Sequence, residues 1–341
     1  MSILLPGGDV KRRDFIARFA GTAAGWPLAA RAQQRSHRLA FVHSGVPADK
    51  LTESAGPFWV RRVYQTLREL GDVEGSNLIV ERFSAEGRAE SFASLAAEVV
   101  SRKPDVIIVK LNDLAKVFTV ATSTIPLVVI TGDPVAGGLL TNLTRPGGNL
   151  TGVSVNAGIE IYGKRLQILK EAMPKMAKVA ALMSSAWTGT DGISAFHEAA
   201  QQLGIELAAK ELPEVNAMRL RRAYDEMAEQ HFDAAIVDEG GTFLAQRALM
   251  VELAAKHLLP VIYPYRDYVE LGGLIAYGPD FSELAQRLAS DVHQIFNGTK
   301  AGDIPFYLPN KLQLVINLKT AKGLGLTVPP MLLTTADELI E

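Results

Sequence analysis

The feature that most constrains the fold is a regular alternation of short apolar runs with amphipathic segments, which begins near Arg38. Runs rich in β-branched residues, such as 105–110 and 125–130, are typical of strands buried on both faces of a parallel sheet. Most are followed by a segment with helical periodicity. The alternation therefore predicts an α/β protein made of βα units with right-handed crossovers.

The apolar and periodic runs give approximate boundaries for these units. We expect strands over residues 39–43, 78–83, 105–110, from 125 onward, 150–155, 178–183, 205–212, 234–237, 260–263, 274–277 and 312–317. We expect helices over residues 58–70, 90–101, 112–122, 159–173, 192–203, 217–230, 242–257 and 281–296, with a short helix near the C-terminus.

The stretch Ile125–Asn156 divides this pattern in two. Its apolar strand ends in a polar turn at Thr131–Pro134, and Pro146, Gly147 and Gly148 then interrupt the chain. A short extended piece follows at 150–155, and the βα pattern restarts after it. We therefore expect two lobes of the same kind, with 150–155 as the first crossover between them.

The N-terminus has the pattern of an export signal. Lys11, Arg12 and Arg13 precede a weakly apolar run rich in Ala and Gly, and small residues at 30 and 32 suit cleavage before Gln33. The paired arginines indicate a twin-arginine signal over residues 1–32. The alternative is that this segment is a membrane anchor or a disordered tail. Its apolar run is too short to span a bilayer, however, and it is interrupted by an arginine. We expect a periplasmic protein without stable membrane insertion.

The composition limits the classes of partner that this protein can bind. The chain of 341 residues has 48% hydrophobic and 21% charged residues, which is ordinary for a globular protein. Residues 1–32 hold five basic and two acidic side chains, so the remainder has 30 basic and 35 acidic ones, a net charge of −5. A mildly acidic chain argues against nucleic-acid binding. With no cysteine, thiolate metal sites and N-terminal lipid anchors on cysteine are excluded.

Several motifs together resemble a known family. They are TGDPV at 131–135, RPGGNLTGVS at 145–154, KRLQILKE at 164–171, YGPD at 277–280 and LVINLKTAKGLGLTVPP at 314–330. Their order along the chain is similar to that of the ABC transporter substrate-binding proteins, a family that includes tryptophan-binding members. The resemblance covers essentially the whole chain after the leader.

The resemblance implies a periplasmic binding protein of type I: two doubly wound parallel-sheet lobes joined by a three-crossover hinge. By similarity, residues 37–153 plus 279–305 form lobe 1, and residues 154–278 plus 306–341 form lobe 2. It also implies that a small organic solute is captured between the lobes and delivered to an ABC permease and its ATPase. An amino acid or an aromatic compound is favoured, and we expect a monomer without a cofactor. A protein that senses a ligand and docks on a signalling receptor is the alternative.

Candidate ligand-binding residues are the polar side chains that follow the predicted strands, because ligands of open α/β sheets bind outside the carboxyl ends of the strands. They are Ser44, Asn112, Asp113, Thr131, Asp133 and Asn156 in the first half, and Ser184, Ser185, Trp187, Asp238, Glu239, Tyr263 and Tyr277 in the second. Each has a structural alternative: the polar ones can cap helices or shape turns, and the tyrosines can be core residues.

The sequence supports an enzymatic function less well than a binding function. Gly152–Asn156 approaches a nucleophile elbow but lacks the second glycine and lies in an extended segment. Phosphate-binding glycine motifs are absent from the sequence, and the six histidines have no paired metal-ligand spacing. The sequence therefore predicts neither catalytic residues nor a metal site.

Overall fold

The computed structural model describes residues 36–184 and 191–341, and the elements below lie in the unit His37–Glu341. Within these residues the first sheet has five parallel strands in the order β2-β1-β3-β4-β5. They are β1 (His37–His43), β2 (Leu78–Ser84), β3 (Val106–Lys110), β4 (Leu127–Thr131) and β5 (Leu150–Ser154).

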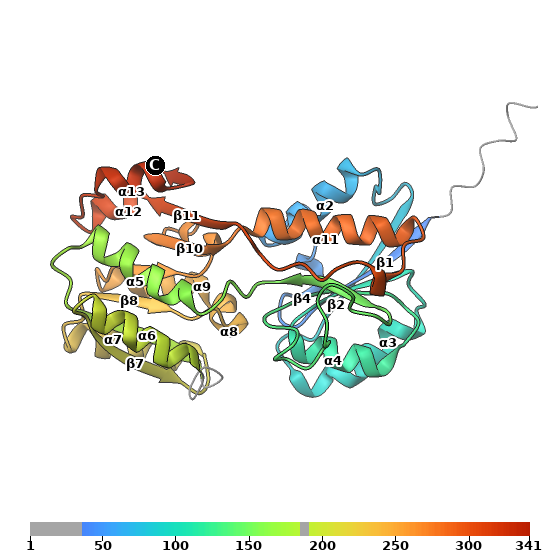
Figure 1. The fold of residues 1–341 in the computed structure, drawn as a ribbon, viewed down its shortest axis with the longest axis horizontal. Coiled ribbons are helices and arrows are strands. Elements are labelled where there is room, and N and C mark those ends of the chain that lie inside the picture. The colour runs from blue at the N-terminus through green and yellow to red at the C-terminus, as the bar shows by residue number, and fades with distance from the viewer. Residues whose placement is uncertain (1–35, 185–190) are drawn as a thin grey trace, which may run out of the picture. The chain divides into compact units, whose positions relative to one another are not determined.

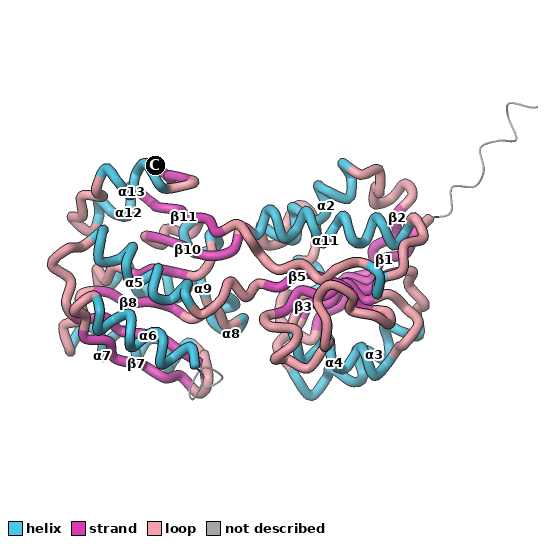
Figure 2. Tube along the Cα trace, in the orientation of Figure 1, coloured by secondary structure: helices cyan, strands magenta, loops and turns pink. Residues whose placement is uncertain are grey.

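Helices cover both faces of this sheet, as Figure 2 shows. Leu39 and Phe41 of β1 belong to one apolar cluster with residues of α2 (Phe58–Glu69) and α11 (Phe281–Phe296). Ala40 and Val42, which alternate with them, belong to another cluster with residues of α3 (Phe92–Ser101) and α4 (Asn112–Ala121). The period-2 alternation of a strand thus sends successive side chains into two helix layers, which is why these strands read as continuous apolar runs. Short 3₁₀ turns lie at Ala48–Lys50, Ala89–Ser91 and Ala301–Asp303.

The second sheet has seven strands within the described residues, in the order β12-β11-β10-β9-β8-β6-β7. They are β6 (Lys178–Ser184), β7 (Glu206–Leu212), β8 (Ala234–Val237), β9 (Val261–Tyr263), β10 (Ile275–Pro279), β11 (Leu312–Asn317) and β12 (Glu338–Ile340). The helices connected to it are α5 (Glu160–Ala172), α6 (Asp191–Gln202), α7 (Ala217–Glu229), α8 (Gly241–Ala245), α9 (Arg247–Lys256), α10 (Arg266–Val269), α12 (Leu318–Gly323) and α13 (Pro330–Thr335).

Most strands and helices lie within two residues of the predicted bounds, but the second sheet differs in three respects. β11 pairs antiparallel with β10, because the chain re-enters the sheet from the other direction after α11. The helix expected over 242–257 is two helices, α8 and α9, which meet at Gln246. The one-turn helix α10 and the edge strand β12 were not predicted, since both are too short for periodicity to be visible.

Within residues 36–184 and 191–341 the chain passes between the two sheets three times (Figure 1). The first crossing follows β5, the second leads from β10 into α11, and the third leads into β11. Tyr307 connects them. Its backbone exchanges hydrogen bonds with Gly152 and Ser154 at 2.8 Å each, and its hydroxyl donates to Glu283 Oε1 at 2.6 Å. The three crossing segments therefore form one hydrogen-bonded hinge.

Asp280, at the start of the second crossing, connects α11 to the third crossing. Asp280 caps α11, since its carboxylate accepts from the backbone N–H groups of Ser282 and Glu283. Its other oxygen accepts from Lys311 Nζ of the third crossing at 2.9 Å. Cap and ion pair together link two hinge segments through one carboxylate.

Asp291 of α11 is fully buried, and its pH response can be predicted. Burial raises its pKa to about 7, although the Arg287 guanidinium, 3.0 Å away, opposes this. The native state then binds more protons than the unfolded state between about pH 4 and pH 7, so the free energy of unfolding falls as pH rises through that window. We expect Asp291→Asn to stabilise the protein at pH 8 by on the order of 1–3 kcal/mol, and much less at pH 5.

Urea unfolding at both pH values measures this difference. Asp303→Asn, a change at an exposed carboxylate, serves as the control. An equal effect of Asp291→Asn at pH 5 and pH 8 would contradict the assignment of the raised pKa to Asp291.

Candidate functional site: charged and aromatic side chains between the two sheets

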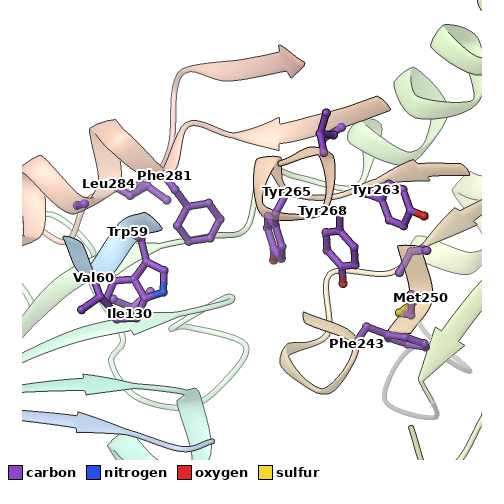
Figure 3. Packing of buried hydrophobic residues seen from close by; sticks show 14 of the residues in the cluster. Trp59, Val60, Ile130, Phe243, Met250, Tyr263, Tyr265, Tyr268, Phe281 and Leu284 are labelled. Carbon is purple, nitrogen blue, oxygen red and sulfur yellow. The ribbon is translucent and has the colours of Figure 1, made fainter. Parts of the chain in front are cut away.

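One apolar cluster contains residues of both sheets. It includes Phe41 and Ile108 from the first sheet and Val237 and Tyr263 from the second. Figure 3 shows Trp59 of α2 and Phe281 of α11 on the side of the first sheet, with Tyr265 and Tyr268 next to them on the side of the second. The ring centroids of Phe281 and Tyr265 are 4.9 Å apart, edge to face. Aromatic residues therefore make the contact between the two lobes.

Lys110 lies at this contact. It is the last residue of β3, and Val106–Val109 before it are fully buried. Its Nζ lies 4.7 Å from the ring centroid of Trp59 and 5.9 Å from that of Phe281, which are cation–π distances. The β3 strand thus places one ammonium group among the aromatic rings.

Two charged residues of the second lobe act on Lys110. Burial lowers the pKa of Lys110 to about 8; Asp267 of α10 opposes this shift, and Arg247 of α9 adds to it. Burial likewise raises the pKa of Asp267, against the effect of Lys110 and Arg247. We call Trp59, Lys110, Tyr265, Asp267 and Phe281 the interlobe cluster.

His43 lies next to the interlobe cluster. It pairs with Lys110 across β1 and β3, and its ring centroid is 6.0 Å from that of Trp59. Its Nδ1 accepts hydrogen bonds from the backbone N–H groups of Gly45 and Val46, both at 2.9 Å. Burial, with a further contribution from Lys110, lowers its pKa well below the usual value. His43 is therefore neutral at pH 7, with its proton on Nε2.

A buried arginine supports the second-lobe side. Arg165 of α5 is fully buried; its Nε donates to the carbonyl of Tyr277 and its Nη2 to Glu239 Oε1, both at 2.7 Å. The backbone carbonyl of Glu239 in turn accepts from the Tyr265 hydroxyl at 3.0 Å. Arg165 and Glu239 thus position the Tyr265 ring of the interlobe cluster.

The predicted residues after β3 and β4 lie together and bind one another. The Asn112 side chain donates to the carbonyl of Gly137 at 3.2 Å and accepts from the Thr131 hydroxyl at 3.0 Å. The Asp133 carboxylate accepts two backbone N–H groups of its own turn, both at 2.9 Å. These three side chains shape the turn after β4, and their contact with a solute stays a prediction.

The other predicted residues of the first half have local contacts of their own. Ser44 is half-buried after β1, and its carbonyl accepts from the backbone N–H of Gly87 at 2.7 Å. Asp113 is exposed, 3.9 Å from Lys116 on its own helix. Asn156 is exposed in the first crossing, where its side chain accepts a backbone N–H two residues later. The structure assigns local hydrogen bonds or ion pairs to all three.

In the second half, Ser184 and Asp238 lie together. The backbone N–H and hydroxyl of Ser184 donate to Asp238 Oδ2 at 2.7 and 2.8 Å, and the Gly240 N–H donates to the other oxygen. Burial raises the pKa of Asp238, and these hydrogen bonds oppose that shift. Ser185 and Trp187 lie outside the described residues.

The two predicted tyrosines point to opposite faces of the second sheet. Tyr263 is fully buried and stacks on Tyr268 at 4.5 Å, behind the interlobe cluster. Tyr277 is half-buried and packs with the apolar residues of the α5 face. Of the predicted residues, Glu239 contacts the interlobe cluster through the Tyr265 hydroxyl, and Tyr263 stacks on Tyr268 behind it.

No group of three or more His, Cys, Asp or Glu side chains in residues 36–184 and 191–341 could hold a metal ion. In the same part of the chain, no helix is both long and apolar enough to cross a membrane. A surface groove lies along α7, lined by Met218, Arg221, Arg222, Asp225, Glu226 and Glu229. These residues belong to one helix and lie outside the interlobe cluster.

Two lobes of parallel-dominated sheets joined by three crossing segments have the fold of the periplasmic binding proteins of type I. The sequence assigns the chain to a particular family within this fold. Residues 59–340 match the family described as ABC transporter substrate binding protein, and the chain belongs to that family.

Known relatives agree with this assignment. A tyrosine-binding protein of Clostridioides difficile (strain R20291) is 24% identical over 264 residues, which are 77% of this chain and 75% of that protein. The structure of an ABC domain from Streptococcus pneumoniae in complex with L-Trp has a TM-score of 0.73 and 22% identity, covering 89% of this chain and 100% of that chain. A conserved domain protein from Vibrio cholerae has a TM-score of 0.76 and 23% identity, with the same coverage.

Proposed function

We propose that this protein is the periplasmic component of an ABC importer. It captures a small aromatic solute between its lobes and delivers it to a membrane permease and the permease's ATPase. The observation that carries the proposal is the interlobe cluster, in which side chains from both lobes and from the hinge meet at one place. The relatives that bind tyrosine and L-Trp support an aromatic solute.

The hinge makes a capture cycle physically reasonable. Its three segments are held to one another by Tyr307 and Asp280, so opening concentrates in few backbone angles, as in other hinged proteins. Closure would remove the solute from water and place its ring against Trp59, Phe281 and Tyr265. Stacking and charge pairing are sufficient for such binding, and we expect no catalytic activity.

Export and assembly are further parts of the proposal. The twin-arginine pattern at residues 11–16 supports transport to the periplasm, where the mature chain would act as a monomer. Cell fractionation of a tagged protein tests this location. Replacement of Arg12 and Arg13 by lysine should retain the protein in the cytoplasm, and unchanged export would refute the twin-arginine route.

Ligand-induced stabilisation tests the binding function. At a solute concentration of 100 times the dissociation constant, a true ligand should stabilise the protein by about 2.7 kcal/mol, which raises the midpoint of thermal unfolding. We expect this shift with aromatic amino acids or aromatic acids, and none with glucose as the control. Small-angle scattering of the same samples should show a smaller radius of gyration with the ligand. No shift with any aromatic compound would refute the proposed class of solute.

Loss of uptake tests the transport function. A strain without this gene should lose import of the solute identified by stabilisation, and the gene should restore it. Normal uptake in the deletion strain, together with tight binding by the purified protein, would instead favour a sensing role.

A further inference from the structure

We propose that the side chain of Leu111, directly after β3, contacts the apolar ring of the bound solute. The inference rests on the proposed function and deepens it, because it names a side chain that meets the solute. Three observations carry it: the backbone strain at Leu111, the exposure of its side chain outside the core, and its position at the edge of the first sheet that faces the second lobe.

The backbone of Leu111 has a conformation that glycine normally occupies. Its φ is 105° and its ψ is 135°. In this region the Cβ atom of any other residue lies too close to the backbone, so leucine costs free energy there that glycine does not. Four other described residues that are not glycine have positive φ, but their values of 50° to 54° lie in the ordinary left-handed region. They are Glu86, Lys103, His231 and Leu258.

Hydrogen bonds on both sides hold Leu111 in this conformation. Its N–H donates to the carbonyl of Ile130 at 3.0 Å, which continues the pairing of β3 with β4. Its carbonyl accepts from the N–H of Ala115 at 2.9 Å and so begins α4. The end of the strand and the start of the helix therefore impose this conformation on whichever residue occupies position 111.

Packing in the core does not explain the leucine. Leu111 is 37% exposed, whereas Val106–Val109 of the preceding strand are fully buried. It belongs to none of the apolar clusters found in residues 36–184 and 191–341. The strain at Leu111 is thus not offset by burial of its side chain in one of these clusters. Residues kept in such conformations are typical of binding and catalytic sites.

The position of Leu111 gives its side chain a use. The strands of the first sheet are parallel and β5 continues directly into the first crossing, so their carboxyl ends face the second lobe (Figure 1). Lys110, the residue before Leu111, reaches the rings of Trp59 and Phe281 in the interlobe cluster. Ligands of open α/β sheets bind at this edge. An exposed leucine there would bury apolar surface against the ring of a solute when the lobes close.

The variant Leu111→Ala tests the contact. Alanine keeps a Cβ atom, and therefore the backbone strain, but lacks the rest of the apolar side chain. Calorimetry with L-tryptophan, L-tyrosine and indole-3-propionate identifies which of these probes binds the wild type. Affinity of Leu111→Ala for that probe should fall about tenfold, the effect expected when a buried apolar contact is lost.

The variant Leu111→Gly separates the contact from the strain. Glycine also lacks the apolar side chain, so its affinity should be as low as that of Leu111→Ala. Because glycine relieves the strain, the free Leu111→Gly protein should unfold at a higher temperature than the free Leu111→Ala protein. Weaker binding by a variant with the higher midpoint would show that the loss of affinity does not come from a loss of folding.

Leu258 provides a matched control. It is also an exposed leucine with positive φ, but it lies between α9 and the amino end of β9. Tyr265 of the interlobe cluster follows the carboxyl end of the same strand. Leu258→Gly therefore relieves strain at the opposite edge of the second sheet, and it should leave affinity for the probe unchanged.

The outcomes distinguish this inference from the proposed function. Wild-type affinity of Leu111→Ala would refute the contact and leave the function standing. If Leu111→Gly alone then bound weakly, the strain itself would be the cause, and the contact would still be refuted. A midpoint of Leu111→Gly below that of Leu111→Ala would refute the strain on which the inference rests. No binding of any of the three probes by the wild type would refute the aromatic solute, and the inference with it.

Discussion

Replacing Arg165 by methionine should lower the free energy of unfolding by about 3–5 kcal/mol, the cost expected when one partner of a buried ion pair is removed. Arg165 is fully buried, and only 16% of the Glu239 side chain is exposed. The change would leave the Glu239 carboxylate without its cation and the Tyr277 carbonyl without a donor. Urea unfolding followed by circular dichroism measures the effect.

Two variants serve as controls for this prediction. Arg165→Met combined with Glu239→Gln should recover part of the loss, because the unpaired charge is gone. Arg222→Met breaks a 2.8 Å pair with Glu226 in which the arginine is 81% exposed, and it should change the stability by less than about 0.5 kcal/mol. A cost of less than about 1 kcal/mol for Arg165→Met would show that the pair is not needed for stability.

Gly152→Ala should destabilise the protein by about 3 kcal/mol or more, because overpacking and backbone strain act at the same residue. Gly152 lies in β5 opposite Val129 of β4, with φ of 151°. A Cβ built there would lie 2.1 Å from the Val129 carbonyl oxygen and 2.6 Å from its nitrogen. Backbone atoms of a central strand cannot move aside, so β5 would have to separate from β4.

The effect should extend to the hinge, since the carbonyl of Gly152 accepts from the Tyr307 N–H of the third crossing. Thermal and urea unfolding would measure the loss. Gly323→Ala is the matched control, because nothing lies within 4 Å of its built Cβ and it ends helix α12. Near-equal stabilities of the two variants would mean that the β4–β5 contact is looser than described.

The fold could be predicted from the sequence because its signals are local. Strands such as β3 and β4 are short apolar runs, and α11 shows its 3.6-residue period over its full length, so both bounds of α11 are confirmed. The family prediction is confirmed as well. The boundary between α8 and α9 was not predicted because no proline marks Gln246. The antiparallel pairing of β11 with β10 was not predicted because it depends on the route of the chain through α11, and local periodicity carries no information about that route.

The candidate site was harder to predict because its residues look structural in the sequence. Trp59 and Phe281 occupy helix positions that also suit a core, and only the fold brings them to the same place. Lys110 did carry a signal, as a charged residue at the end of a strand that is otherwise apolar. A rule that considers only the polar residues after each strand leaves out the last residue of the strand itself.

Polar residues after strands also have a competing role. The side chains of Asn112 and Asp133 accept or donate hydrogen bonds in the turn after β4, and Asp238 binds the end of β6. Such local bonding satisfies backbone groups at the ends of elements whether or not a solute is present. A single sequence does not distinguish the two roles, and the binding measurements above would.

The threefold passage of the chain between the sheets has a consequence for biosynthesis. The first sheet is complete in sequence at Ser154, yet one of its faces is covered by α11, which ends at Phe296. The second sheet lacks β11 and its edge strand β12 until Ile340 has been made. A nascent chain therefore exposes apolar strand faces until residue 340 has been made. Because each lobe is built from discontinuous segments, one cut of the chain does not separate the lobes, and both should reach their final structure only after residue 340 has left the ribosome.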